Sequence, residues 1–371
     1  MVSSPYRNNS EKGAQMNRRP TVYQVAERAG VSIATVSFAF RQPNRVRPTT
    51  RDAVLAAARE LGYVPSASAR GLARGHTGAF GMYSFNLRPL AGPSPLSPED
   101  ESGLDPLAES DPRIFPVYVD EVQRGFELEC QAAGLAVLLA SSAASDRVMD
   151  TAGRVDGLAV FTGPRPVEAL DVIAQRVPIV AFNTGPEVAA VSHVRVDNRA
   201  GVRAVVEHLV EGHGYTDLAF AGETEMYDFA ARFEAFREAL AERGLPVPPA
   251  PLPPDRAGRA PRNTIRALAQ SGALPRAIVC ASDQLALDVM ESLAGLGITV
   301  PAQVAVTGFD GILAGRLSRP TLTTVRQPMT EMGRLAVQIL QRLQATPGAD
   351  PETHELPVRL VPRGSCGCPD A

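Results

Sequence analysis

Short apolar runs alternate with helix-like stretches along most of the chain, from residue 77 to residue 310. The runs VDGLAVF (155–161) and VPIVAF (177–182) are largely apolar, which is typical of strands that a parallel sheet buries on both faces. This alternation predicts a doubly wound α/β fold in two lobes. The other strands that we expect are 79–85, 135–140, 216–222, 277–281 and 304–310, with helices at 122–133, 199–210, 230–243, 284–296 and 329–343.

An α/β fold of this kind places its ligand site in a known location. Ligands bind beyond the carboxyl ends of the strands, so the residues that follow each strand are site candidates. Here they combine aromatic rings with hydrogen-bonding groups, which suits a polyhydroxylated ligand. No phosphate-binding glycine motif follows any expected strand, which argues against a nucleotide. The candidates are Phe85, Asn86, Phe161, Thr162, Asn183, Thr184, Gly222, Glu223, Ser282, Asp283, Phe309 and Asp310.

The charge of the chain is divided unevenly. Residues 1–76 carry a net charge of +8 and the rest carries −11, although the whole chain stands at only −3. A basic segment ahead of an acidic body is typical of a protein whose first segment contacts a polyanion.

Residues 21–40 have the pattern of two short helices joined by a tight turn. Thr21 is a good N-cap, and Gln24 completes a capping box three residues later. Gly30 would end the first helix, and Ser32 would cap the second. Such a pair predicts a helix-turn-helix, whose second helix fits the major groove of DNA.

A third helix is indicated between Pro48 and Leu61, with Gly62 as its stop. The domain would then span residues 20–64. A small helical bundle without a DNA role is the alternative, but the polar outer face of the second helix, framed by arginines, argues against it. The core that we expect contains Val25, Val36, Val54 and Leu61.

Residues 65–76 form a separate short segment. Pro65 breaks the chain, and Ser66 can cap a helix that ends before Gly75. A helix of fewer than about 12 residues is marginal by itself. We therefore expect this segment to fold only with a partner.

The stretches TVYQVAERAGVSIATVS, TRDAVLAAARELGYVP and ARGLA resemble the LacI/GalR family of bacterial transcriptional regulators. The resemblance implies a helix-turn-helix, a hinge helix that orders on operator DNA, and an effector domain related to periplasmic sugar-binding proteins. It also implies that Leu72 wedges into the minor groove. Phe38 departs from the arginine or leucine of many members, so it is either a DNA-facing or a core residue. The DNA-binding residues we predict are Thr21, Tyr23, Ser32, Ile33, Ala34, Thr35, Ser37, Phe38, Arg45, Arg47, Ser66, Ala69, Arg70 and Leu72.

The resemblance continues through VRVDNRAG, EHLVEGHGYTDLAFAG, CASDQLALDVM and VAVTGFD. It implies that Arg232 grips the effector, with Asp310 and Ser282 as further ligands. Other roles stay open from the residues alone: helix N-caps for Asp197, Ser282 and Asp283, a solvent-facing Arg232, and a turn position for Asp310. The effector-binding residues we predict are Phe85, Phe161, Asn183, Asp197, Arg232, Ser282, Asp283, Phe309 and Asp310.

Several segments are expected to stand outside this core pattern. We expect a disordered tail at 1–19, with Met16 as an alternative start, and a mobile, acidic, proline-rich loop at 88–113 within an effector and dimerisation domain of 77–363. Residues 364–371 are expected to be a tail. Its Cys366 and Cys368 lack the second ligand pair of a zinc site, so no metal and no cofactor is predicted.

Taken together, the residues favour a cytoplasmic homodimer that binds a palindromic operator and responds to a small effector, most simply a sugar. No apolar stretch is long enough for a membrane span, and no nucleophile elbow or metal cluster points to an enzyme. A repressor is the form that we predict. The alternative is a sugar-binding protein of the same fold without a DNA role, which leaves the basic first segment unexplained.

Overall fold

The computed structural model of the chain describes residues 20–64, 76–85, 117–141, 146–162, 168–185, 190–253, 255 and 261–369. The chain divides into two compact units, Met1–Thr77 and Gly78–Ala371. The predicted tail at 1–19, most of the hinge segment, and the loop at 88–113 lie outside the described residues.

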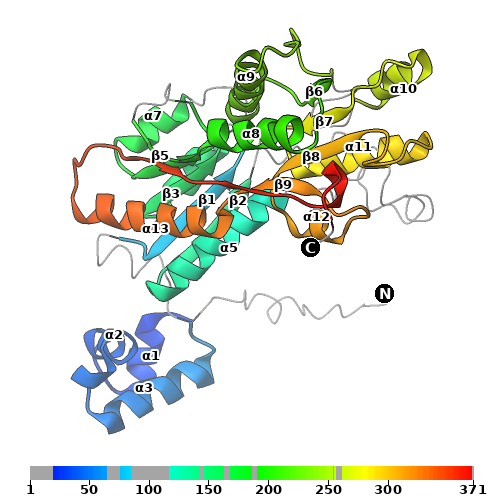
Figure 1. Cartoon of the computed structure of the whole chain (residues 1–371). Helices are drawn as coiled ribbons and strands as arrows, with labels where there is room; N and C mark the ends of the chain where they lie inside the picture. The colour runs from blue at the N-terminus through cyan, green and yellow to red at the C-terminus, as the bar shows by residue number, and fades with distance from the viewer. Residues whose placement is uncertain are drawn as a thin grey trace, which may run out of the picture. The chain divides into compact units, whose positions relative to one another are not determined.

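The described part of the N-terminal unit contains three helices, α1 (Val22–Ala29), α2 (Ile33–Arg41) and α3 (Pro48–Leu61), which Figure 1 shows in blue. A 3₁₀ turn at Pro43–Arg45 lies between α2 and α3. Gly30 adopts the left-handed conformation (φ 66°) that ends α1, a conformation that costs glycine little. The predicted helix-turn-helix is therefore present.

The core of this unit is made by small and β-branched side chains. Val25, Val36 and Val54 are fully or almost fully buried, and Leu61 packs against them while partly buried. All four predicted core residues are thus confirmed. Because the inner faces of the three helices form this core, the outer face of α2 is exposed to solvent.

The C-terminal unit contains two sheets. The first has the order β10-β5-β4-β3-β1-β2 and is parallel throughout. It follows the prediction of a doubly wound lobe, with two additional strands, β5 and β10, that the apolar pattern did not indicate. Its strands are β1 (Ala79–Ser84), β2 (Ala136–Ser141), β3 (Gly157–Phe161), β4 (Ile179–Phe182), β5 (Ser192–Val196) and β10 (Thr353–Leu356).

The second sheet has the order β11-β9-β8-β7-β6 and is parallel except for the edge strand β11, which runs antiparallel to β9. Its strands are β6 (Leu218–Ala221), β7 (Ala277–Cys280), β8 (Ala305–Asp310), β9 (Thr323–Arg326) and β11 (Arg359–Val361).

Helices cover both faces of the first sheet. Alternate residues of β3 separate the faces: Ala159 and Phe161 pack with α5 (Val117–Ala132), whereas Leu158 and Val160 pack with α7 (Ala169–Ala174). The other helices are α6 (Asp146–Ala152), α8 (Asn198–Glu207), α9 (Tyr227–Ala241), α10 (Arg262–Ser271), α11 (Asp283–Gly295), α12 (Leu313–Leu317) and α13 (Met329–Ala345), with a π-helical turn at His208–Gly212.

Helices α5 and α13 of the first lobe cross in direct backbone contact (Figure 1). A methyl group on Gly125 would overlap the carbonyl oxygen of Thr330, and one on Gly333 would overlap that of Val122. The absence of a side chain at these two positions is what permits the close approach.

The chain passes between the two sheets three times, after β5, after β9 and after β10. At one crossover the backbone N–H of Gln327 donates to the carbonyl oxygen of Asp310, 2.9 Å away. The residues from 364 onward, expected as a tail, continue the second lobe: Gly364–Cys366 form a buried 3₁₀ turn, and Ser365 is fully buried. Among the described residues, no helix is long and apolar enough to cross a bilayer.

Candidate nucleic-acid interface and effector site

The outer face of α2 combines exposed small residues with two exposed apolar ones. Val36 and Ala39 point into the core, whereas Ser32, Ile33 and Ala34 at the start of the helix are exposed. The Ser32 hydroxyl accepts a hydrogen bond from the backbone N–H of Thr35 at 3.1 Å. This cap leaves the first turn of α2 facing solvent, and a helix N-terminus with free N–H groups favours phosphate.

Phe38 does not belong to the core, because 39% of its surface is exposed. The guanidinium of Arg45 lies 5.7 Å from the centre of its ring. Phe38 is therefore not a core residue, and its ring forms part of the outer face of α2. One turn further along, the guanidinium of Arg41 donates to the carbonyl oxygen of Ser37 and also contacts its hydroxyl.

Two exposed arginines follow α2 in the chain. Arg45 and Arg47 are exposed, and neither forms an ion pair within the described part of the chain. Arg28, by contrast, is paired with Glu60 at 2.7 Å. Thr21 and Tyr23 are also exposed, at the start of α1.

Four predicted DNA contacts cannot be placed. Ser66, Ala69, Arg70 and Leu72 of the hinge segment lie outside the described residues. Their roles remain predictions.

The second candidate site lies in the C-terminal unit and centres on Arg232 of α9. Its side chain is only 2% exposed. The guanidinium donates to the side-chain oxygen of Asn198 at 2.8 Å and to the carbonyl oxygen of Ala281 at 2.6 Å. It also lies over the ring of Phe309, 3.7 Å from the ring centre. The solvent-facing alternative for Arg232 is therefore wrong.

Two buried carboxylates approach this guanidinium. Asp228 lies 3.8 Å from it and Asp310 lies 3.9 Å from it. Burial raises the pKa of both acids, while the positive charge of Arg232 opposes that rise. Asp310 also accepts a hydrogen bond from the Gln327 side chain at 2.7 Å, so it is a buried group rather than a surface turn residue.

The first lobe contributes aromatic and amide groups to the same region. Tyr118 of α5 donates to the side-chain oxygen of Asn183 at 3.1 Å, and its ring packs edge-on against Phe161. Burial raises the pKa of Tyr118, and the negative charges of Asp228 and Asp310 raise it further. Tyr118 of the first lobe therefore lies within electrostatic range of the two acids of the second lobe.

Some buried polar atoms in this region have no hydrogen-bond partner among the described residues. They include Oδ2 of Asp228, Oε1 of Gln327 and the hydroxyl of Ser84, at the carboxyl end of β1. Buried polar groups are normally satisfied, so such orphans mark positions where a ligand can supply the missing partner. Asp228 lies on a helix away from any strand end, so the strand-end rule missed it. Asn198 comes two residues after β5, a strand that the apolar pattern did not indicate, and it was missed for that reason.

The remaining predicted effector residues have structural roles near the site. Asp197 caps α8 by accepting from Ala200, and Ser282 caps α11 by accepting from Leu285. Asp283 is fully buried, and its carboxylate accepts hydrogen bonds from the backbone of the turn after β8 and from the hydroxyl of Thr324. The N-cap alternative thus holds for Asp197 and Ser282. Phe85 is half-buried and packs on Tyr83.

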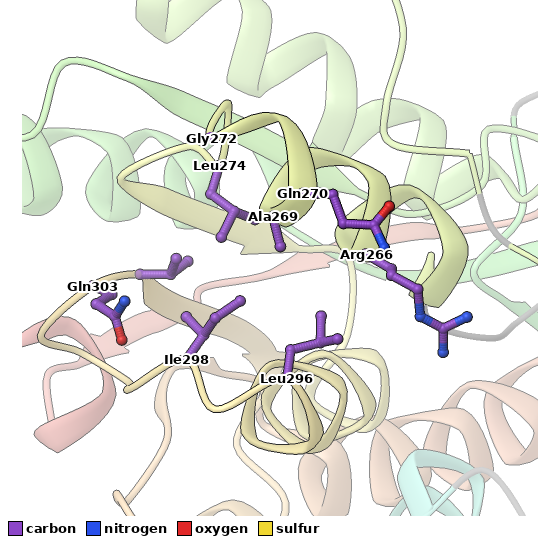
Figure 2. A pocket seen from close by; sticks show the side chains of 9 residues that line it. Arg266, Ala269, Gln270, Gly272, Leu274, Leu296, Ile298 and Gln303 are labelled. Atoms are coloured by element: carbon purple, nitrogen blue, oxygen red, sulfur yellow. The ribbon is translucent and has the colours of Figure 1, made fainter.

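An open hollow of about 710 Å³ lies elsewhere, between α10 and the turn that follows α11 (Figure 2). It is bordered by Leu274 ahead of β7 and by Val304 ahead of β8, which places it at the amino ends of these strands. Ligands of open α/β sheets bind at the opposite edge, so this hollow is not our candidate effector site.

Two known families match parts of the chain. Residues 21–66 match the bacterial regulatory proteins of the lacI family, and residues 206–366 match the periplasmic binding protein-like domain. The first match coincides with the helix-turn-helix unit, and the second spans the strands of the second sheet together with α13 and β10 of the first lobe.

Curated relatives align over nearly the whole chain. Catabolite control protein A of Priestia megaterium is 27% identical over 355 residues, which cover 93% of this chain and 98% of the relative. The HTH-type transcriptional repressor PurR of Proteus mirabilis is 28% identical over 358 residues, 93% of this chain and 96% of the relative.

Solved structures share the fold. The lac repressor dimer bound to operator and an anti-inducer superposes with a TM-score of 0.73 at 23% identity, covering 94% of this chain and 99% of that chain. The transcriptional regulator CelR in complex with cellobiose superposes with a TM-score of 0.62 at 26% identity, covering 94% and 100%.

Proposed function

Because this chain belongs to the LacI/GalR family of bacterial regulatory proteins, we propose that it is a DNA-binding transcriptional repressor whose operator affinity is controlled by a small effector. The observation that carries the proposal is the outer face of α2, where Ser32, Ile33, Ala34 and Phe38 are exposed. Arg45 and Arg47 follow this helix, exposed and without an ion pair among the described residues. Such a face suits the major groove, because its small residues allow close approach and its arginines meet phosphates.

A homodimer would place two such helices on a palindromic site. Half-sites read by paired helix-turn-helix units lie one helical turn apart, about 34 Å. Support for self-association comes from exposed apolar side chains around the edge strand of the first lobe: Leu128 on α5, Leu139 on β2 and Met149 on α6. Both α5 and α6 contact the edge strand β2, one on each face of the sheet, so the three side chains lie around the same edge.

The effector that fits the buried cluster is a polyhydroxylated molecule, and a sugar is the simplest case. The orphaned oxygens of Asp228 and Gln327 need hydroxyl donors, and the buried rings of Phe161 and Phe309 contribute apolar surroundings to the same cluster. Arg232 supplies donors in the same place. The complex of CelR with cellobiose, at 26% identity, supports this choice of ligand class.

The effector would act by changing how the lobes sit against each other. Tyr118 and Asn183 belong to the first lobe, whereas Asp228 and Arg232 belong to the second, so a ligand among them contacts both. Gln327 joins Asp310 to a crossover between the lobes. A ligand that favours one lobe arrangement can thereby change DNA affinity by a coupling of about 1–3 kcal/mol.

DNA binding is tested with the full chain and fluorescently labelled promoter fragments from its own genome, with a random duplex of equal length as control. We expect at least one fragment to bind tightly enough to resist an excess of random duplex at moderate salt. Equal affinity for every duplex would refute sequence-specific recognition and leave the ligand-binding alternative.

Effector binding is tested by thermal shift of the full chain against a panel of sugars and nucleosides. A ligand of the native state raises the melting temperature by mass action. We expect a sugar to do so and then to change the affinity for the selected fragment. A nucleoside that binds while every sugar fails would overturn the assignment of ligand class but leave the DNA role intact.

A further inference from the structure

The end of the chain brings two cysteines to two histidines that are distant in sequence. His208 begins the π-helical turn after α8, and His213 directly follows that turn. Cys366 lies in the C-terminal 3₁₀ turn, and Cys368 follows two residues later. The sequence analysis set the C-x-C pair aside because it had no second ligand pair. The fold supplies that second pair as H-x₄-H.

The four ligand atoms converge closely. They all lie within 4.8 Å of one another. The two Nε2 atoms of His208 and His213 are 3.2 Å apart, and Cys368 Sγ is 3.5 Å from each of them. Cys366 Sγ lies 3.3 Å from Nε2 of His208.

Four of the six separations match the edges of a zinc tetrahedron, whereas the widest separation in the group, 4.8 Å, would have to shorten when a metal binds. With ordinary Zn–N and Zn–S bonds, the edges are about 3.3 Å between two nitrogens and about 3.6 Å between a nitrogen and a sulfur. The measured nitrogen–nitrogen and nitrogen–sulfur distances agree with these edges to within about 0.3 Å.

The turn that carries the cysteines is held in place by its surroundings. Gly367 between them has a φ of 106°, a conformation that favours glycine, and a Cβ there would meet the Tyr215 hydroxyl at 3.3 Å. The Tyr215 hydroxyl donates to the carbonyl oxygen of Cys366 at 3.1 Å, and its ring stacks on His213. Ser365, fully buried, donates to the carbonyl oxygen of Val306 at 2.6 Å.

We propose that His208, His213, Cys366 and Cys368 form a structural zinc site that fastens the C-terminal segment to the second lobe. Thiolate and imidazole ligands suit Zn²⁺, whereas Mg²⁺ and Ca²⁺ require oxygen. Four protein ligands fill the tetrahedron and leave no open position for catalysis, so the role is structural. On binding, the two thiols give up their protons to solvent and coordinate as thiolates.

The site has a route for the metal. Cys366 is buried, but the other three ligands are only partly buried. An ion can therefore reach them from solvent without unfolding of the lobe.

The experiment uses the full chain, purified, treated with a chelator under reducing conditions, and reloaded with Zn²⁺ or Co²⁺. We expect one zinc per chain after removal of excess metal, and with Co²⁺ the visible absorption bands of a tetrahedral ion with thiolate ligands. Cys368→Ser should lose both signals. The matched control is Cys130→Ala, a free cysteine in the first lobe, which should keep both.

A second measurement distinguishes loss of the metal site from failure of a variant to fold. Zn²⁺ should raise the melting temperature of the chelator-treated wild type and of Cys130→Ala, but not that of Cys368→Ser or His208→Gln. The proposal is overturned if wild-type protein gives no tetrahedral cobalt spectrum. It is equally overturned if zinc washes out of the wild type as readily as out of Cys368→Ser. Neither readout depends on DNA or on the effector.

Discussion

The guanidinium of Arg232 lies 3.7 Å from the centre of the Phe309 ring, and this contact joins α9 to the end of β8. A cation over an aromatic face gains about 2 kcal/mol or more when both groups are desolvated. The same guanidinium faces Asp228 and Asp310. Arg232 therefore organises the second-lobe half of the candidate effector site.

Replacing Arg232 by lysine should abolish the effector-induced rise in melting temperature, because an ammonium cannot make the two hydrogen bonds to Asn198 and to Ala281. The free energy of unfolding should also fall by about 1–3 kcal/mol, since buried acceptors lose their donors. Arg237→Lys is the control, because Arg237 on the same helix pairs with Glu234 at the surface. An Arg232→Lys protein that responds normally to the effector would remove Arg232 from the site.

Asp228 makes the stability of the protein depend on pH. Burial raises the pKa of its carboxyl in the folded state. The native state therefore retains this proton above the unfolded pKa of about 3.9, and the ionised form costs stability as the pH rises further. In Asp228→Asn this cost is absent, so the stability of the variant relative to wild type should increase as the pH rises above that unfolded value, with the two proteins compared at about pH 5 and about pH 7. Urea unfolding at both pH values measures the change, and a difference that shrinks with rising pH would contradict it.

Much of the fold follows from hydrophobic pattern. The strands β3, β4, β7 and β8 are buried on both faces and therefore appear in the sequence as continuous apolar runs. Strand β5 has the sequence SHVRV, in which His193 and Arg195 interrupt the apolar pattern although the strand is mostly buried. His193 is accommodated because its ring hydrogen-bonds to Thr184 at 2.7 Å, a partner that only the fold provides. Short edge strands such as β10 and β11 carry no apolar run at all.

The candidate sites, like the fold, could be predicted from the sequence only in part. The strand-end rule placed Asn183, Phe309 and Asp310 at the carboxyl ends of their strands, because topology alone determines those positions, and their role in effector binding stays a prediction. The strand-end rule missed Tyr118, because this residue lies on a helix and its contact with Asn183 joins segments 65 residues apart. The sequence analysis also missed the histidine–cysteine cluster. Its two halves are more than 150 residues apart, and neither half is a metal motif by itself.

The contact between α5 and α13 should be sensitive to a single methyl group. Gly333→Ala would place a carbon against the backbone of Val122 and Phe126, which cannot move without shifting α5. Overpacking of this kind costs about 1–3 kcal/mol. Gly295→Ala in α11 is the control, because a Cβ there meets nothing within 4 Å, and it should be neutral or slightly stabilising. Chemical denaturation of both variants measures the difference, and equal stabilities would show that the helices separate easily.

The charge on the outer face of α2 should appear directly in the salt dependence of DNA binding. Arg45 is exposed without an ion pair among the described residues, whereas Arg28 in the same unit is paired with Glu60 at 2.7 Å. A phosphate-contacting cation releases about one counterion, so Arg45→Gln should reduce the slope of log affinity against log salt by about 1. Arg28→Gln, with its charge already compensated, should change the slope much less. Affinities of both variants for the selected promoter fragment and for random duplex, measured between low and moderate salt, give these slopes. If the two substitutions change them equally, Arg45 is an ordinary surface charge and the interface lies on another face of the unit.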